Sequence, residues 1–224
     1  MDAAHRSGTL AEEVFARLRR DLVAGCFQPG SRLRMDEMCS RYGVGISPLR
    51  EALSRLATHG LVTQASQRGF RVRAATAADL RDIAATRAML ECQAMKQSIA
   101  RGDDAWEAGV VSAHHLLAKI DPRRIAEAPL RETWEARHRE FHFAILAACG
   151  SPWLLHLCGL LYDQFDFYRR LAHFAGRRQP YLAGQHARLV AAVTARRPAQ
   201  AAAVLKTHIE ETAQAVAREL KLDP

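Results

Sequence analysis

Apolar residues recur every three or four positions along most of the chain, a spacing typical of amphipathic helices. The first predicted helix covers 9–24, where the apolar stripe begins at Leu10 and Gly25 marks the end. Apolar and polar residues alternate at 61–63 and 70–73, which predicts a small β-hairpin. The other predicted helices cover residues 36–42, 48–59, 77–101, 103–119, 129–149, 152–174, 181–196 and 198–220.

The order of these elements predicts two domains and a mainly α fold. A helix, a very short strand at 32–34, two helices joined by a turn and a hairpin together make a winged helix-turn-helix, assigned to 1–75. Residues 76–224 show no strand pattern and are expected to form an all-α bundle of about six helices. Thr76, with Asp79 three residues later, has the spacing of a helix start.

The stretch 43–56 has the pattern of a helix that presents one polar face. Ser47 is predicted to cap this helix and Pro48 to occupy its first turn. Leucines and an alanine at helical spacing form its apolar face, and Arg50 lies on the opposite face. The stretch is interpreted as a DNA-reading helix; the alternative is an ordinary amphipathic helix with one solvated arginine.

The charge of the chain favours a nucleic-acid partner for the first domain. The chain has 224 residues and a formal net charge of +8. Residues 1–75 contain 12 arginines and only 7 acidic residues, so this third of the chain is the more basic part.

Cysteine usage and the apolar segments indicate a cytoplasmic protein without a membrane span. The five cysteines never form a C-x-x-C pair, so they are expected to be reduced and buried. Residues 143–162 carry no Lys, Arg, Asp or Glu, but Gly150-Ser151-Pro152 interrupts them. We therefore expect two buried helix halves here, and no signal core precedes them in residues 1–8.

Four histidines lie on predicted inward faces of the second domain. His138 and His142 share one helix face with apolar residues, and His186 and His208 lie on later apolar stripes. Imidazoles from three helices could together bind a divalent cation through neutral nitrogens. The alternative is that each is a hydrogen-bonded core residue, and spacing alone does not separate these four from His114 and His156.

Five short motifs occur in a fixed order within the first domain. They are Leu-Arg-Arg-Asp-Leu-Val-Ala-Gly (18–25), Pro-Gly-Ser-Arg-Leu (29–33), Gly-Val-x-x-Ser-Pro-Leu-Arg-Glu-Ala-Leu-x-x-Leu (43–56), Gly-Leu-Val (60–62) and Arg-Gly-Phe-x-Val (68–72). Through them residues 9–73 resemble the DNA-binding domain of the GntR family of bacterial regulators.

This resemblance implies a set of DNA-contacting residues. It places the helix after Ser47 in the major groove, with Arg50 facing a guanine edge. It also places Arg34, Ser47 and Arg41 near phosphates or groove edges, and Gly69 of the wing near the minor groove.

Two positions depart from the family pattern. Many family members have Ser-Arg where this chain has Gly45-Ile46, so a frequent DNA-contacting arginine is absent. Ile46 could contact a thymine methyl instead. Asp36 occupies a position where some members have another arginine.

Residues 77–220 resemble the FCD effector domain of the FadR branch of the same family. Arg87-x-x-x-Glu91 matches its first helix, and His142, His186 and His208 match its histidine positions. The resemblance implies a divalent metal, and His138 replaces the family aspartate. Either His138 serves as a nitrogen ligand, in which case zinc or nickel is expected over manganese, or the site has lost its metal; the first is preferred because the other three ligand positions are kept. Arg87 is the implied anchor for an effector carboxylate; the alternative is a simple helix pair with Glu91.

The leading hypothesis is a ligand-responsive DNA-binding transcriptional regulator. It would act as a homodimer on a palindromic operator in double-stranded DNA and sense a small carboxylate. One alternative is a metal-dependent hydrolase, with Glu91 or Glu140 as the inward base. Another is a helical interaction module whose basic first domain binds nucleic acid without sequence preference.

Overall fold

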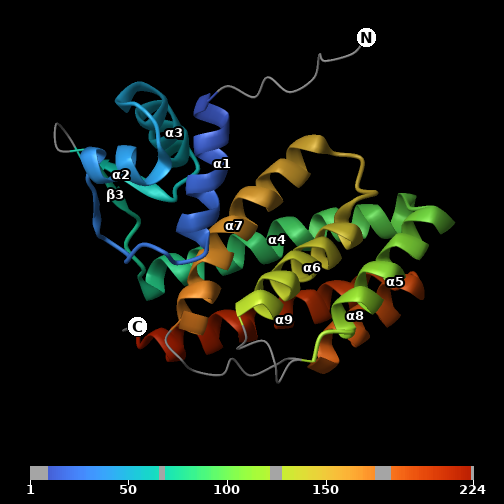
Figure 1. Ribbon diagram of the computed structural model, residues 1–224. Coiled ribbons are helices and arrows are strands. Elements are labelled where there is room, and N and C mark those ends of the chain that lie inside the picture. The colour runs from blue at the N-terminus through green and yellow to red at the C-terminus, as the bar shows by residue number, and fades with distance from the viewer. Residues whose placement is uncertain (1–9, 66–68, 122–127, 175–182, 223–224) are drawn as a thin grey trace, which may run out of the picture.

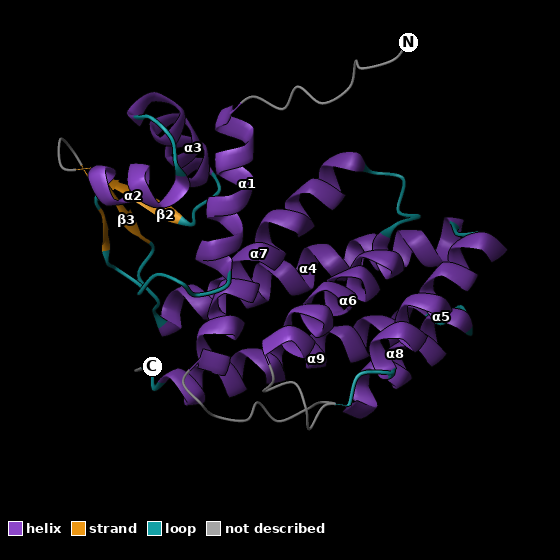
Figure 2. Cartoon of the chain, in the orientation of Figure 1, coloured by secondary structure: helices purple, strands orange, loops and turns teal. Residues whose placement is uncertain are grey.

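A computed structural model describes residues 10–65, 69–121, 128–174 and 183–222. A small N-terminal domain with a three-stranded sheet lies beside a larger helical domain (Figures 1 and 2). This arrangement confirms the predicted mainly α fold, with a winged helix-turn-helix followed by an all-α bundle.

The N-terminal domain contains three helices and the small sheet. The elements are α1 (Leu10–Val23), β1 (Arg32–Leu33), α2 (Met35–Tyr42), α3 (Ile46–Thr58), β2 (Val62–Ala65) and β3 (Gly69–Val72). The strands are antiparallel in the order β1-β3-β2, with Leu33 opposite Phe70 and Val62 opposite Val72. These apolar residues pack with the inner faces of α1 and α3, which fixes α3 with its polar face outward. Residues 67 and 68 of the predicted turn lie outside the described residues.

The start of α3 corrects one sequence prediction. Its N-cap is Gly45, in extended conformation and without a side-chain cap, and α3 begins at Ile46. Ser47 is therefore an exposed residue of the first turn and not the cap. The Ser47-Pro48 pair correctly predicted where the first turn of the helix lies. It did not identify the first residue, because proline is tolerated throughout the first turn.

The C-terminal domain is a bundle of long helices. They are α4 (Ala77–Arg101), α5 (Asp104–Ala118), α6 (Ala128–Leu146), α7 (Pro152–Phe174), α8 (Ala183–Thr194) and α9 (Pro198–Leu220). Helix α4 packs along α9 and α7, and α6 lies between α4 and α5 (Figure 1). Thr76 caps α4 as expected, because its hydroxyl accepts a hydrogen bond from the Asp79 amide at 3.2 Å. Residues 181 and 182 of the predicted 181–196 helix are not among the described residues.

The uncharged stretch 143–162 is split between two helices, as the interruption predicted. Gly150, at φ +71°, lies between the end of α6 and the start of α7. Among the described residues, none of the helices has the length and apolar character needed to cross a bilayer.

The burial expected for the cysteines is only partly correct. Cys149 and Cys158 are buried, Cys39 and Cys92 are half-buried, and Cys26 is exposed. Cys26 follows the end of α1, where the chain turns at the surface, so helical periodicity no longer determines its burial.

Candidate metal centre and nucleic-acid interface

The four histidines selected from the sequence lie together in the core of the helical domain. His138 and His142 come from α6, His186 from α8 and His208 from α9. One nitrogen from each ring lies within 4.8 Å of the others, and all four residues are buried. His114 is half-buried and His156 exposed, and neither belongs to this group.

Neighbouring side chains orient two of the rings by their outer nitrogens, and a carboxylate lies near a third. Gln185 donates its amide to Glu211 at 2.5 Å, so its carbonyl oxygen is left to accept from His208 Nδ1 at 2.9 Å. The Tyr162 hydroxyl lies 2.8 Å from His138 Nδ1. A Glu91 oxygen lies 4.0 Å from His142 Nδ1. These contacts leave the Nε2 atoms to face the centre of the group, an arrangement typical of metal-ligating histidines.

The inner nitrogens lie close enough together to share one cation. His138 Nε2 and His142 Nε2 approach to 3.2 Å. His186 Nε2 is buried and has no hydrogen-bond partner within the part of the chain that the structure describes. A buried nitrogen without a partner costs free energy unless an ion satisfies it. The donor set therefore fits a divalent metal such as zinc or nickel.

Electrostatics keeps the four imidazoles neutral. Burial, reinforced by the neighbouring histidines, holds the pKa of His138, His142 and His208 well below the usual value. Burial, followed by the charge of His114, lowers the pKa of His186 to about 4. A neutral imidazole can coordinate a metal at neutral pH without first losing a proton.

Arg87 and Glu91 form a buried ion pair next to the histidines. Arg87 Nε donates to Glu91 at 2.5 Å, and its guanidinium lies over the Tyr162 ring at 4.5 Å. The helix pair considered from the sequence is thus present, and it lies at the wall of the histidine group. Glu140, the second carboxylate predicted to face inward, is exposed, so that assignment was wrong.

The sequence did not reveal a second buried charge network. Arg169 on α7 donates to Glu135 on α6 at 3.0 Å and also pairs with Asp166. Its guanidinium lies 5.1 Å from the Trp134 ring, which stacks on His138 at 4.6 Å. Burial raises the pKa of Glu135 to about 7, against the opposing effect of Arg169. The only sequence signal was that the four charged residues of α7 lie within eight positions, 163–170, of an otherwise uncharged helix.

Of the predicted DNA-contacting residues, Gly69 is half-buried and the others are exposed, namely Arg34, Arg41, Ser47 and Arg50. Arg50 lies on the outer face of α3 and has no hydrogen bond or ion pair with a described residue. Arg34 instead pairs with Glu37 at 3.2 Å, and Arg41 pairs with Asp21 at 3.4 Å. Gly69 begins β3 with φ +89°, and a Cβ built on it would meet nothing within 4 Å.

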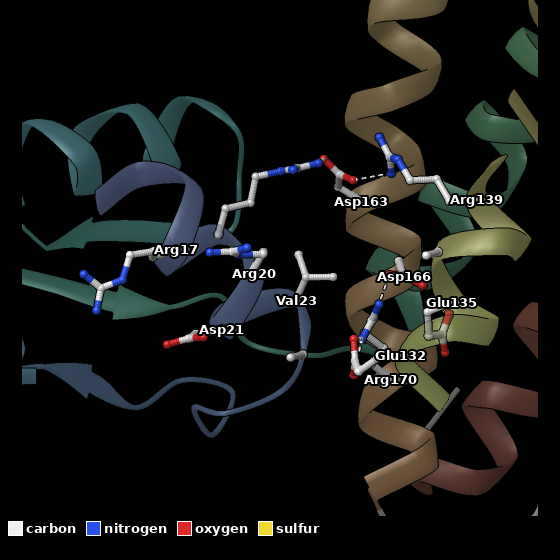
Figure 3. Close-up of a pocket in the computed structure, with 13 residues that line it drawn as sticks. Arg17, Arg20, Asp21, Val23, Glu132, Glu135, Arg139, Asp163, Asp166 and Arg170 are labelled. Carbon is white, nitrogen blue, oxygen red and sulfur yellow. Dashed lines mark hydrogen bonds and ion pairs between the residues drawn. The ribbon is translucent and has the colours of Figure 1, made fainter. Parts of the chain in front are cut away.

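A charged cleft of about 650 Å³ separates α1 from α6 and α7 (Figure 3). Asp163 of α7 lies at one end, where Arg19 Nε donates to it at 3.1 Å from the N-terminal domain. Arg139 of α6 donates to the same carboxylate at 2.7 Å, as Figure 3 shows. Asp163 therefore links both domains through one carboxylate.

Helix α7 makes further contacts with the N-terminal domain. The Gln164 amide donates to the His59 carbonyl, and its own carbonyl accepts from Arg73 at 2.8 Å. One turn later the Tyr168 hydroxyl donates at 2.6 Å to Asp79 of α4, within the helical domain, and Arg73 pairs with the same carboxylate. Since Tyr162 reaches His138 from the same helix, α7 touches both the histidine group and the N-terminal domain.

The comparisons with known proteins agree with this two-part architecture. The model of the bacterial regulatory proteins of the gntR family matches residues 10–72, and the FCD domain model matches residues 82–211. The chain belongs to the GntR family. It is a transcription regulator of the GntR/FCD type with a domain that binds double-stranded DNA, and it is not an enzyme.

Two GntR relatives match over most of their length. The chain is 40% identical over 209 residues to an uncharacterized HTH-type transcriptional regulator, BphR, from Paraburkholderia xenovorans, covering 93% of this chain and 85% of BphR. It is 40% identical over 200 residues to the HTH-type transcriptional repressor GlaR from Escherichia coli, covering 86% of this chain and 89% of GlaR.

Solved structures show the same fold at low identity. The Escherichia coli protein McbR/YncC superimposes with a TM-score of 0.77 at 21% identity, over 95% of this chain and 99% of that one. A GntR regulator from a Rhodococcus species gives a TM-score of 0.72 at 23% identity, over 96% of this chain and 99% of that one. Both comparisons support the arrangement of the helices described above.

Proposed function

We propose that this GntR regulator is a repressor that senses a small carboxylate next to a divalent metal in its helical domain. The observation that carries the proposal is the group of four buried, neutral histidines with inward Nε2 atoms. The 40% identity to the repressor GlaR supports the direction of regulation. A regulator of bacterial promoters acts in the cytoplasm.

His138, His142, His186 and His208 would hold the metal. Four neutral ligands leave the charge of a divalent cation uncompensated, so the bound metal supplies a positive site for an anion. Tyr162 orients the His138 ring and Gln185 the His208 ring from outside.

Arg87 is the proposed anchor for the effector carboxylate. Its guanidinium is buried at the wall of the histidine group. Glu91 accepts from Nε and from one terminal nitrogen of Arg87, so other N–H donors of the guanidinium remain for a carboxylate. An Arg87→Ala protein should bind metal and DNA but should lose the response to effector. An intact response in this variant would show that Arg87 only pairs with Glu91.

The signal would pass from the metal centre to the DNA along α7. A change at His138 displaces Tyr162, and the adjacent Asp163 and Gln164 contact the N-terminal domain. Ligand binding changes DNA affinity only if it favours one orientation of that domain over another. The contacts of α7 would make the orientation of the N-terminal domain depend on the metal centre, because the side chains of α7 pair with partners in both domains.

On the DNA side, we propose a homodimer that presents two α3 helices to a palindromic operator. Residues 1–75 would form the DNA-binding unit, and residues 76–224 would bind effector and hold the two copies together. Arg50 would contact a guanine in the major groove, Ser47, Arg34 and Arg41 would contact the backbone, and Gly69 would approach the minor groove. The ion pairs of Arg34 and Arg41 are exposed, so phosphates can replace their partners at little cost.

The first experiment is footprinting on the region upstream of the gene that encodes this chain. A protected palindrome, released on addition of a carboxylate found in a melting-temperature screen, is the expected result. The screen covers sugar acids, hydroxy acids and dicarboxylates, each with and without zinc or nickel. Salt-sensitive binding without a preferred site would contradict the proposal and favour non-specific nucleic-acid binding.

A further inference from the structure

Ile46 is an apolar residue at the start of α3 that the protein core does not use. It is the first residue of α3, and 59% of its surface is exposed. The inner face of α3 is fully formed by other residues, namely Leu49, Ala52, Leu53 and Leu56. Ile46 therefore projects from the side of the helix that also carries Arg50.

The surroundings of Ile46 leave room for a large partner. The preceding residue, Gly45, has no side chain, and a Cβ built on it would meet nothing within 4 Å. Gly45 also provides no side-chain cap for the amides of the first turn. Uncapped amides at a helix start attract phosphate, which would bring this end of α3 close to the DNA backbone.

An apolar side chain at this position has one specific partner among the bases. In the major groove only thymine presents a methyl group, so contact with an apolar side chain separates thymine from the other three bases. We infer that Ile46 reads a thymine methyl in each operator half-site, which makes it a specificity-determining residue. This inference rests on the proposed binding of α3 in the major groove.

The spacing on α3 locates that thymine relative to the guanine of Arg50. Four residues of α-helix advance by about 6 Å, and stacked base pairs rise by about 3.4 Å. The thymine read by Ile46 should therefore lie within about two base pairs of the guanine read by Arg50.

The test begins with selection of binding sites from a pool of randomised duplex DNA by the full-length chain. Each thymine of the selected half-site is then replaced by deoxyuridine, which removes only the methyl group. For the wild-type protein, one replacement close to the guanine should weaken binding about fourfold, the value expected for one buried methyl. The Ile46→Ala variant should bind the thymine and deoxyuridine duplexes equally.

The control is Ser47→Ala, a change at the next exposed residue of the same turn. It should alter the affinity for both duplexes by the same factor and keep the fourfold ratio. A wild-type protein insensitive to every replacement, or an Ile46→Ala protein that keeps the ratio, would overturn the inference while leaving the regulator intact. Failure to select any sequence would overturn both this inference and the proposed operator binding.

Discussion

The Tyr162 hydroxyl lies 2.8 Å from His138 Nδ1, while the next residue of α7 accepts a hydrogen bond from the N-terminal domain. The contact fixes the orientation of the His138 ring, and when Nδ1–H donates to the phenol oxygen the Nε2 lone pair is left for a metal. Adjacent residues of one rigid helix thus bind the candidate metal centre and the DNA-reading domain.

Tyr162→Phe should weaken metal binding. The change removes the hydrogen bond that orients His138 and leaves the ring packing in place, and loss of such an outer partner costs at least about tenfold in affinity. Zinc affinity is measured by competition with a chelator. Tyr168→Phe is the matched control, since Tyr168 lies on the same helix but contacts Asp79 instead of a histidine. Equal zinc affinity in all three proteins would contradict this role of Tyr162.

Asp163→Asn should reduce the dependence of DNA affinity on the bound metal. The neutral amide pairs poorly with Arg19 and Arg139, so the N-terminal domain is held less firmly against α7. Couplings of this kind are typically about 5- to 150-fold, and the variant should lose most of that factor. DNA affinity is measured with and without zinc by fluorescence anisotropy.

The control for that experiment is Glu132→Gln. Glu132 is an exposed acid of the same cleft and pairs with Arg170 within the helical domain. This substitution should leave the dependence on zinc unchanged. If the Asp163→Asn and Glu132→Gln proteins behave alike, the contact between Asp163 and Arg19 does not transmit the signal.

Periodicity predicted the helices and the inward direction of the four histidines, because both depend on residues close together in the sequence. It could not predict the buried pair of Arg169 and Glu135, since these residues are far apart in sequence and stabilise each other only after α6 and α7 pack. For the same reason the link between Asp163 and Arg19 emerged only from the structure. The predicted N-cap, Ser47, lies two residues after the observed N-cap, Gly45, which is the usual size of error at a helix end.

The metal-free protein should lose stability as the pH falls below about 6.5. His186 has a pKa of about 4 in the folded protein, so between these values the unfolded chain binds more protons. Its contribution to the free energy of unfolding is complete above the unfolded pKa and decreases by about 3 kcal/mol on going down to the folded pKa.

The measurement is urea denaturation of chelator-treated protein at a series of pH values. His186→Gln should reduce the slope between pH 4 and 6.5 by the share of one histidine, since the replacement does not titrate whereas the other three histidines still do. An unchanged slope in this variant would show that His186 is not buried in its neutral form.

Arg50→Ala should weaken operator binding by about 1–3 kcal/mol and relax the preference for one guanine. Arg50 has no hydrogen bond or ion pair with a described residue, so the folded protein should keep its melting temperature. Arg50→Lys retains the charge but not the planar fork, and should restore non-specific affinity without the guanine preference. A folded Arg50→Ala protein that binds its operator normally would exclude this contact.

The central claim is that the four histidines hold a metal that the regulator uses. The most direct measurement is the metal content of the full-length chain purified without a histidine tag, combined with its melting temperature after chelation and addition of zinc or nickel. We expect one divalent ion per chain and a clear rise in melting temperature, both lost in a His142→Ala/His208→Ala protein. No bound metal, together with no rise in melting temperature, would contradict the account.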